Sequence, residues 1–132
     1  MNHKSSLIAV TLGAVLLAGV AIAGSKFTGN GSVVVVKASD GSGSATGYFG
    51  HVYNAPTVNE FIGCQKYVDG GLYCQAKTEG NVHVTCSSNS AYLGKAVSSL
   101  SPDARVTFRW NAAGVCTGIT VTHSSEYQDK QG

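Results

Sequence analysis

The stretch that decides the fold is VDGGLYCQAKTEGNVHVTCSS, residues 68–88. Apolar and polar residues alternate on both sides of a turn that contains glycine, and a period of two is typical of half-buried strands. The inward-facing set comprises Leu72, Cys74, Ala76, Val82, Val84 and Cys86. The stretch therefore predicts a β-hairpin with a cysteine on the core-facing side of each strand.

The loop between these two runs determines how the strands pair. Both apolar faces lie on one side of the hairpin only if the loop holds an odd number of residues. Residues 78–80 satisfy this condition, with Gly80 in the left-handed position of a three-residue loop. This register places Cys74 opposite Val84 and Leu72 opposite Cys86, so we expect the two cysteines to be diagonal neighbours.

The cysteines are even in number and predict two disulfides. Cys64, Cys74, Cys86 and Cys116 are separated by 10, 12 and 30 residues, which gives none of the close pairs of a zinc ribbon. Three pairings are possible, and loop entropy does not separate them. Diagonal partners within one hairpin usually lie too far apart to be bridged. This disfavours Cys74 with Cys86 and favours Cys64 with Cys74 and Cys86 with Cys116.

The N-terminal segment has the features of a secretory signal peptide. Lys4 supplies a positive charge, residues 7–20 are largely apolar, and Ala21, Ile22 and Ala23 form a small-residue cleavage pattern. Glycines interrupt the apolar run, which barely reaches the roughly 18 to 20 residues that a membrane-spanning helix needs. We expect a signal peptide over residues 1–23, no stable membrane anchor after cleavage, and a secreted or periplasmic location.

The remaining 109 residues, 24–132, suffice for a single disulfide-stapled β domain. Without Lys4 they carry eight Lys and Arg against seven Asp and Glu, so no nucleic-acid partner is expected. Charged residues are 12% of the chain and glycines number 17. The surface must therefore consist largely of Ser, Thr, Asn, Gln and Gly, as is typical of extracellular β domains.

The rest of the chain completes a mainly β fold. Besides the hairpin, strands are expected over residues 33–36, 48–54, 58–68, 105–111 and 115–123. A loop rich in Gly and Ser is expected over residues 40–47. These elements predict an antiparallel β-barrel or sandwich of about seven strands with one helix over an open end, or else an α+β sheet with the helix packed on a face.

The predicted helix lies within residues 88–101. Ser88 or Ser90 is its candidate N-cap, and Pro102 ends it. Its apolar stripe is expected to face the core, and comprises Tyr92, Leu93, Ala96, Val97 and Leu100.

The last predicted hairpin contains a register conflict. Turn chemistry over residues 111–114 sets Cys116 opposite Trp110, whereas the apolar Ile119 faces inward only in a register one residue away. A β-bulge at Gly118 would let both Cys116 and Ile119 face the core, and we expect it there.

No motif of a known catalytic class is present. His51, His83 and His123 fall on polar strand positions or near strand ends, where solvated imidazoles are expected, and the carboxylates are scattered. Oxidised cysteines leave no thiol nucleophile. We therefore expect no enzyme, no catalytic residue, no metal and no cofactor, and a small secreted hydrolase ranks third among the functions considered.

Exposed tyrosines are the feature of the sequence that bears on binding to a partner. Tyr48, Tyr53 and Tyr73 are candidate binding residues, because exposed tyrosine supplies rigid contact area with a polar tip, although ordinary structural roles are favoured. The leading expectation is a secreted, non-catalytic binding or inhibitor-like module for an unknown protein or carbohydrate partner.

The alternative is a self-assembling filament or envelope subunit. The β-branched run Val33, Val34, Val35, Val36 could complete a neighbouring subunit's sheet by strand addition. An ordinary first strand of the chain's own sheet is the favoured interpretation of this run.

Overall fold

The computed structural model describes residues 33–54 and 59–124. The predicted signal peptide, residues 1–23, lies outside this part. No helix in the two described ranges is long and apolar enough to cross a membrane.

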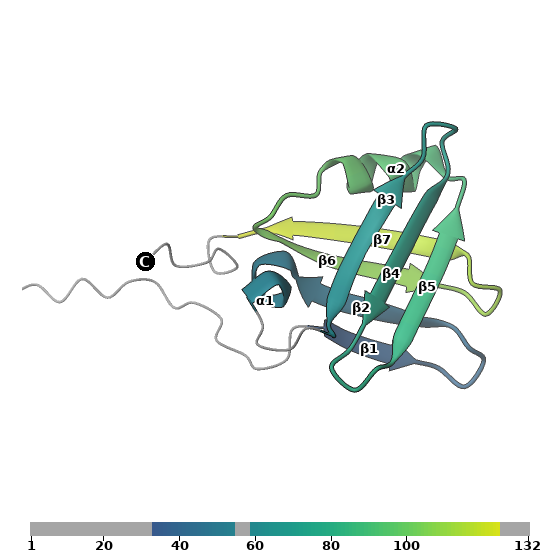
Figure 1. Cartoon of the computed structure of the whole chain (residues 1–132). Helices are drawn as coiled ribbons and strands as arrows, with labels where there is room; N and C mark the ends of the chain where they lie inside the picture. Colours follow the sequence, from purple (N-terminus) through teal and green to yellow (C-terminus); the bar gives the residue numbers. More distant parts are fainter. Residues whose placement is uncertain (1–32, 55–58, 125–132) are drawn as a thin grey trace, which may run out of the picture.

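The described chain is mainly β, as predicted, with seven strands in two antiparallel sheets and two helices (Figure 1). In chain order the elements are β1 (Val33–Lys37), β2 (Gly43–Tyr48), α1 (Phe49–Asn54), β3 (Phe61–Lys66), β4 (Leu72–Lys77), β5 (His83–Ser88), α2 (Ala91–Ser98), β6 (Ala104–Trp110) and β7 (Cys116–His123). One sheet has the order β1-β2-β6-β7 and the other β3-β4-β5. The sheets lie face to face with their strands running across one another, as a sandwich rather than a closed barrel (Figure 1).

The core lies between the two sheets. Phe108 and Val106 of β6 and Leu72 and Cys74 of β4 are its largest fully buried side chains. Each belongs to a strand whose alternate residues are buried, so the period of two seen in the sequence places them inward. Burial of such side chains contributes about 1.5–3 kcal/mol each to folding.

The loop expected over residues 40–47 is largely wrong, because β2 occupies Gly43–Tyr48. Its glycines and alanine alternate with hydroxyl side chains, and Ala45 is fully buried opposite Phe108. Small residues leave room on the inner face of β2 for the bulky side chains of β6. The small residues that suggested a flexible loop therefore allow β2 to pack closely against its neighbours.

The strand expected over residues 48–54 is also wrong after its first residue. Phe49–Asn54 forms the short helix α1, so the described residues contain two helices rather than the one expected. Phe49 and Val52, three residues apart, pack against the core, while Tyr53 is 89% exposed. A segment this short fits both periodicities, so its apolar pattern alone did not distinguish helix from strand.

The predicted helix α2 is present and shorter than expected. Ser90 is its N-cap, and the Ser90 hydroxyl accepts a hydrogen bond from the backbone N–H of Leu93 at 3.3 Å. Leu93 and Val97 are buried, whereas Tyr92, expected on the core-facing stripe, is 81% exposed. The helix lies against β7 and β3 and covers one end of the sandwich (Figure 1).

The central hairpin has a longer loop than predicted. Lys77 pairs with His83, so the loop spans five residues, and the left-handed position belongs to Asn81, with φ of 64°, rather than Gly80. The Thr78 hydroxyl accepts the backbone N–H of Val82 at 3.1 Å, which stabilises this loop. Five is also odd, so the inward faces of both strands still match, but Val82, expected on the inward face, lies in the loop and is 41% exposed.

The revised register changes the relationship between the cysteines. Cys74 lies directly opposite Cys86 rather than diagonal to it. The favoured pairing is nevertheless confirmed, because the disulfides join Cys64 to Cys74 and Cys86 to Cys116. The first links neighbouring strands β3 and β4, and the second links the two sheets. Two disulfides indicate an oxidising location outside the cytoplasm.

The bulge in the last hairpin is confirmed. Trp110 pairs with Cys116 and Arg109 pairs with Gly118, which leaves Thr117 as the extra residue, one position before the glycine. Cys116 is 3% exposed and forms the disulfide between the sheets. The bulge therefore lets one strand satisfy both the turn and the apolar pattern.

Candidate functional site

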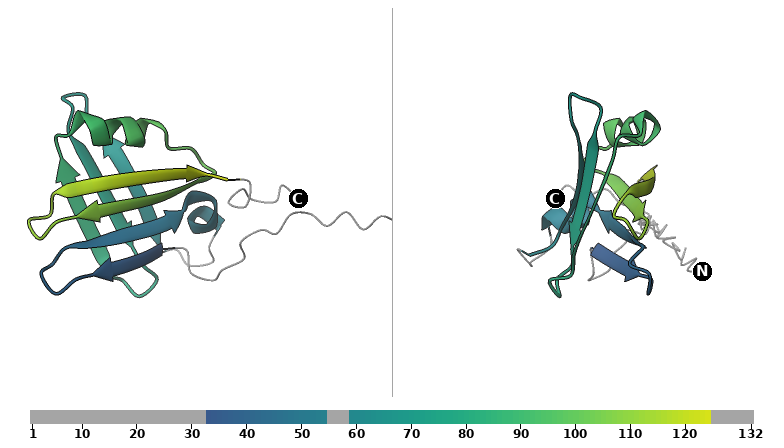
Figure 2. Two further views of the ribbon diagram at one scale, coloured as in Figure 1. Left: turned by 180° about the vertical axis from the view of Figure 1, so that it is seen from behind. Right: turned by 90° about the vertical axis from the view of Figure 1, so that its right-hand side faces the viewer.

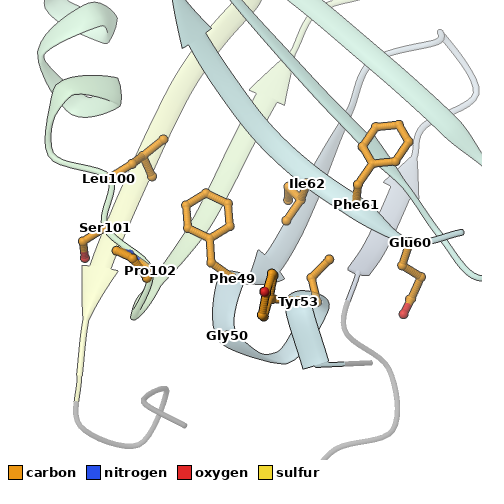
Figure 3. Close-up of a pocket in the computed structure, with 10 residues that line it drawn as sticks. Phe49, Gly50, Tyr53, Glu60, Phe61, Ile62, Leu100, Ser101 and Pro102 are labelled. Carbon is orange, nitrogen blue, oxygen red and sulfur yellow. The ribbon is translucent and has the colours of Figure 1, made fainter. Parts of the chain in front are cut away.

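A pocket opens at the end of the sandwich where α1 lies (Figure 3). Its volume is about 600 Å³, within the range of small-molecule sites. The lining comes from α1, from the start of β3, and from the connection between α2 and β6. Three separate parts of the chain therefore build it.

The walls of the pocket are mainly hydrocarbon. Phe49 and Val52 lie one helical turn apart on α1, Ile62 points inward from β3, and Leu100 follows the end of α2. Figure 3 shows the ring of Phe49 between Leu100 and Ile62. All four pack in or against the core, so their positions are fixed by the fold. This set was not predicted from the sequence, because only the tertiary structure brings its members together.

Tyr53 stands at the rim of this pocket, exposed on α1 (Figure 3). The other two predicted binding tyrosines lie elsewhere. Tyr48 is on the outer face of the four-stranded sheet, where the guanidinium of Arg105 lies 5.3 Å from its ring centroid. Tyr73 is on the outer face of the three-stranded sheet, beside a hollow of about 140 Å³. The three candidates thus occupy three different surfaces.

Glu60 lies at the edge of the pocket, immediately before β3. Its Oε1 accepts a hydrogen bond from the backbone N–H of Val33 at 3.4 Å. The carboxylate therefore connects the start of β1 to the start of β3, on opposite sheets.

Ser101 brings a polar group to the pocket rim and contacts two ionisable residues. Its Oγ is hydrogen bonded to Oδ1 of Asp103 and lies 3.1 Å from Nδ1 of His123, while Nδ1 and Oδ1 are 3.8 Å apart. His123, expected to be a solvated imidazole, is thus engaged with Ser101 and Asp103. In a hydrolytic triad the imidazole stands between hydroxyl and carboxylate. Here the hydroxyl contacts both the imidazole and the carboxylate directly, so the order of the three groups differs from that of a triad.

The three histidines are on different parts of the fold. His51 lies on α1, with its ring centroid 6.1 Å from that of Tyr48. His83 begins β5 and packs edge-on against Phe61 at 5.5 Å. Within the described residues, the group compact enough to hold a metal is that of Cys74, Cys86 and Cys116, and disulfides occupy its sulfurs.

Val33, Val34, Val35 and Val36 form most of β1, which pairs with β2 in its own sheet, as the favoured interpretation expected. β1 is the edge strand of that sheet. Val33 is buried, whereas Val34 and Val36 are 56% and 60% exposed on the outer face.

One carboxylate away from the pocket has a shifted pKa. Asp40 lies in the turn between β1 and β2, where the hydroxyl and the backbone N–H of Ser42 donate hydrogen bonds of 2.5 and 2.8 Å to Oδ1. These bonds, the hydroxyl first, stabilise the charged form and lower the pKa of Asp40. The group is fully exposed, and these hydrogen bonds lie within the turn itself.

No known protein family matches this chain, and comparisons with curated proteins and with solved structures give no significant match.

Proposed function

We propose that this chain is an exported, non-catalytic binding domain that holds apolar side chains of a partner protein in the pocket beside α1. The observation that carries the proposal is the open, hydrocarbon-walled pocket built by Phe49, Val52, Ile62 and Leu100.

The openness of the pocket favours a protein segment over a free small molecule. Small-molecule sites usually bury most of the ligand's surface, whereas this pocket is open to solvent along one side. A side chain of a partner protein needs only its tip enclosed by the pocket, because the rest of the partner protein covers the opening. The exposed Tyr53 at the rim supports this view, because tyrosine is enriched in protein interfaces.

The polar groups at the rim have partners within the fold. Ser101 is hydrogen bonded to Asp103, and Glu60 accepts the N–H of Val33, so both are engaged in structural contacts. Export is supported by the signal-like residues 1–23 and by the two disulfides. A secreted or periplasmic partner is consistent with both features.

A titration with N-acetyl-phenylalaninamide, a mimic of an apolar side chain, tests the pocket by amide chemical shifts in NMR. We expect saturable shifts at Phe49, Val52 and Ile62. Tyr53→Ala should weaken binding by about threefold to tenfold, since loss of a rim aromatic removes up to about 1.4 kcal/mol.

Tyr92→Ala is the matched control for this titration. Tyr92 is also an exposed tyrosine on a helix, but it lies outside the pocket lining, so its removal should leave the affinity unchanged. Equal weakening by both variants, or shifts without saturation, would argue against a specific site.

A second candidate function is self-assembly through β1. The observation that favours it is the position of β1 at the sheet edge with Val34 and Val36 exposed, since an edge strand can template the addition of another chain. Light scattering of the purified protein over a range of concentrations separates the candidates, because self-assembly raises the mass with concentration and pocket binding does not.

A further inference from the structure

The outer face of the four-stranded sheet carries two arginines among hydroxyl side chains. Strands β2, β6 and β7 point Thr46, Thr107 and Thr120 outward in one row, with Arg105 and Arg109 on either side of Thr107. In Figure 2 (left) this sheet faces the viewer, with α1 and α2 at its margins rather than over its strands. The face is therefore open among the described elements.

Arg105 is held on this face by packing rather than by an ion pair. Its guanidinium lies 5.3 Å from the ring centroid of Tyr48, its partner in the strand register. Its Nε is buried and has no hydrogen-bond partner within the described part of the chain. Among the described residues, no carboxylate forms an ion pair with this guanidinium.

Arg109 provides a second charge on the same face. It is exposed and lies four residues further along β6, roughly 13 Å from Arg105 at the usual rise of a strand. Its Nη1 extends over Gly118 of β7, 4.0 Å from where a Cβ would stand. Between the two arginines, the hydroxyls of Thr107 and Thr46 are hydrogen bonded at 2.8 Å.

Carboxylates are placed away from this face. Those of the described residues lie in turns, loops and the residues that precede strands, at Asp40, Glu60, Asp69, Glu79 and Asp103. Asp103, the nearest in sequence to Arg105, is engaged with Ser101 and His123. Within residues 33–54 and 59–124, the strands of the four-stranded sheet therefore carry arginines on this face and no Asp or Glu.

We propose that this face binds an acidic polysaccharide, with Arg105 and Arg109 contacting its carboxylates and the threonine row contacting its hydroxyls. The planar guanidinium donates paired hydrogen bonds to a carboxylate, and threonine both donates and accepts, which matches the alternation of charge and hydroxyl groups on a uronic-acid polymer.

Two other ligand classes fit this face less well. A nucleic acid favours stacking aromatics and a strongly basic domain, whereas Tyr48 is already covered by Arg105 and the net charge of the chain is only +2. A protein partner usually needs a large apolar anchor at the centre of the contact, where this face has Thr107. The inference does not depend on the pocket beside α1.

Affinity electrophoresis through gels containing polygalacturonate tests the inference, with neutral dextran as the reference polymer. The wild-type protein should be retarded by polygalacturonate and not by dextran, and added salt should reduce the retardation. Arg105→Gln with Arg109→Gln should weaken the interaction at least about tenfold, since both charge-assisted contacts are lost. Arg109→Gln alone, at an exposed position, should weaken it in part.

The matched control removes the same charge elsewhere. Lys77→Gln with Lys95→Gln, on β4 and α2, should change the retardation by less than about twofold if the arginines provide local contacts rather than net charge. Circular dichroism confirms that each variant is folded. Three results would overturn the inference: no retardation of the wild type, equal losses in the two double variants, or tighter binding to a DNA oligonucleotide than to polygalacturonate.

Discussion

Gly43 lies directly opposite Trp110 on neighbouring strands, and the indole fills the space that a side chain at Gly43 would need. A Cβ on Gly43 would stand 2.6 Å from Cζ2 of Trp110 and 2.3 Å from the carbonyl oxygen of Val36. The indole Nε1 also donates to the carbonyl of Gly41 at 2.9 Å, which holds the ring in this position. The hairpin of β1 and β2 therefore packs against the indole of Trp110 at Gly43, where only the absence of a side chain leaves room.

Gly43→Ala should therefore destabilise the fold by about 1–3 kcal/mol, because overpacking against backbone forces the strands to shift. The measurement is the free energy of unfolding in urea. Gly63→Ala is the control, since Gly63 is also in a strand and a Cβ there would meet nothing within 4 Å. Equal effects of the two substitutions would contradict the proposed packing.

The two disulfides should differ in their contribution to stability. Loop entropy predicts about 3.6 kcal/mol for Cys86–Cys116 and about 2.7 kcal/mol for Cys64–Cys74, because the first closes the longer loop. Double alanine variants of each pair, compared by urea unfolding, measure the difference. A greater loss on removal of Cys64–Cys74 would show that the link between the sheets is not the dominant crosslink.

The turn between β1 and β2 should show a pH-dependent contribution from Asp40. Its pKa is lowered in the folded state by Ser42, so the stabilisation is present above the unfolded value of about 3.9 and is lost as pH falls through the folded pKa. Ser42→Ala should raise the pKa of Asp40 toward its ordinary value, as followed by NMR of the carboxyl carbon. Ser87→Ala, on β5, should leave that titration unchanged.

The self-assembly candidate makes a separate prediction about β1. If the edge of β1 joins copies of the chain, Val34→Lys with Val36→Lys should abolish any concentration-dependent increase in mass measured by light scattering, because charges on an edge strand oppose strand addition. Val82→Lys, at an exposed valine in the loop between β4 and β5, should not. A constant monomeric mass for the wild type would exclude this candidate.

Alternation along the chain was sufficient to predict β6 and the hairpin of β4 and β5. Local chemistry predicted the N-cap Ser90 and the bulge near Gly118, because a cap and a bulge depend on neighbouring residues. The pairing of cysteines was correct although the register behind it was not, since the five-residue loop places Cys74 opposite Cys86.

The features that escaped prediction depend on contacts between distant residues. The strand character of Gly43–Tyr48 follows from Trp110 and Phe108 on β6, far away in sequence. The pocket exists because α1 and the segment after α2 meet at one end of the sandwich. The periodicity of neighbouring residues does not show which distant segments meet. An apolar binding site could therefore not be predicted from the sequence.

The most direct test of the pocket is an intermolecular NOE experiment on the purified protein with N-acetyl-phenylalaninamide. The proposed binding predicts NOEs from the ligand ring to the methyl groups of Val52, Ile62 and Leu100. NOEs only to exposed methyl groups outside the pocket, such as those of Val36 or Val82, or no NOEs at saturating ligand, would contradict it.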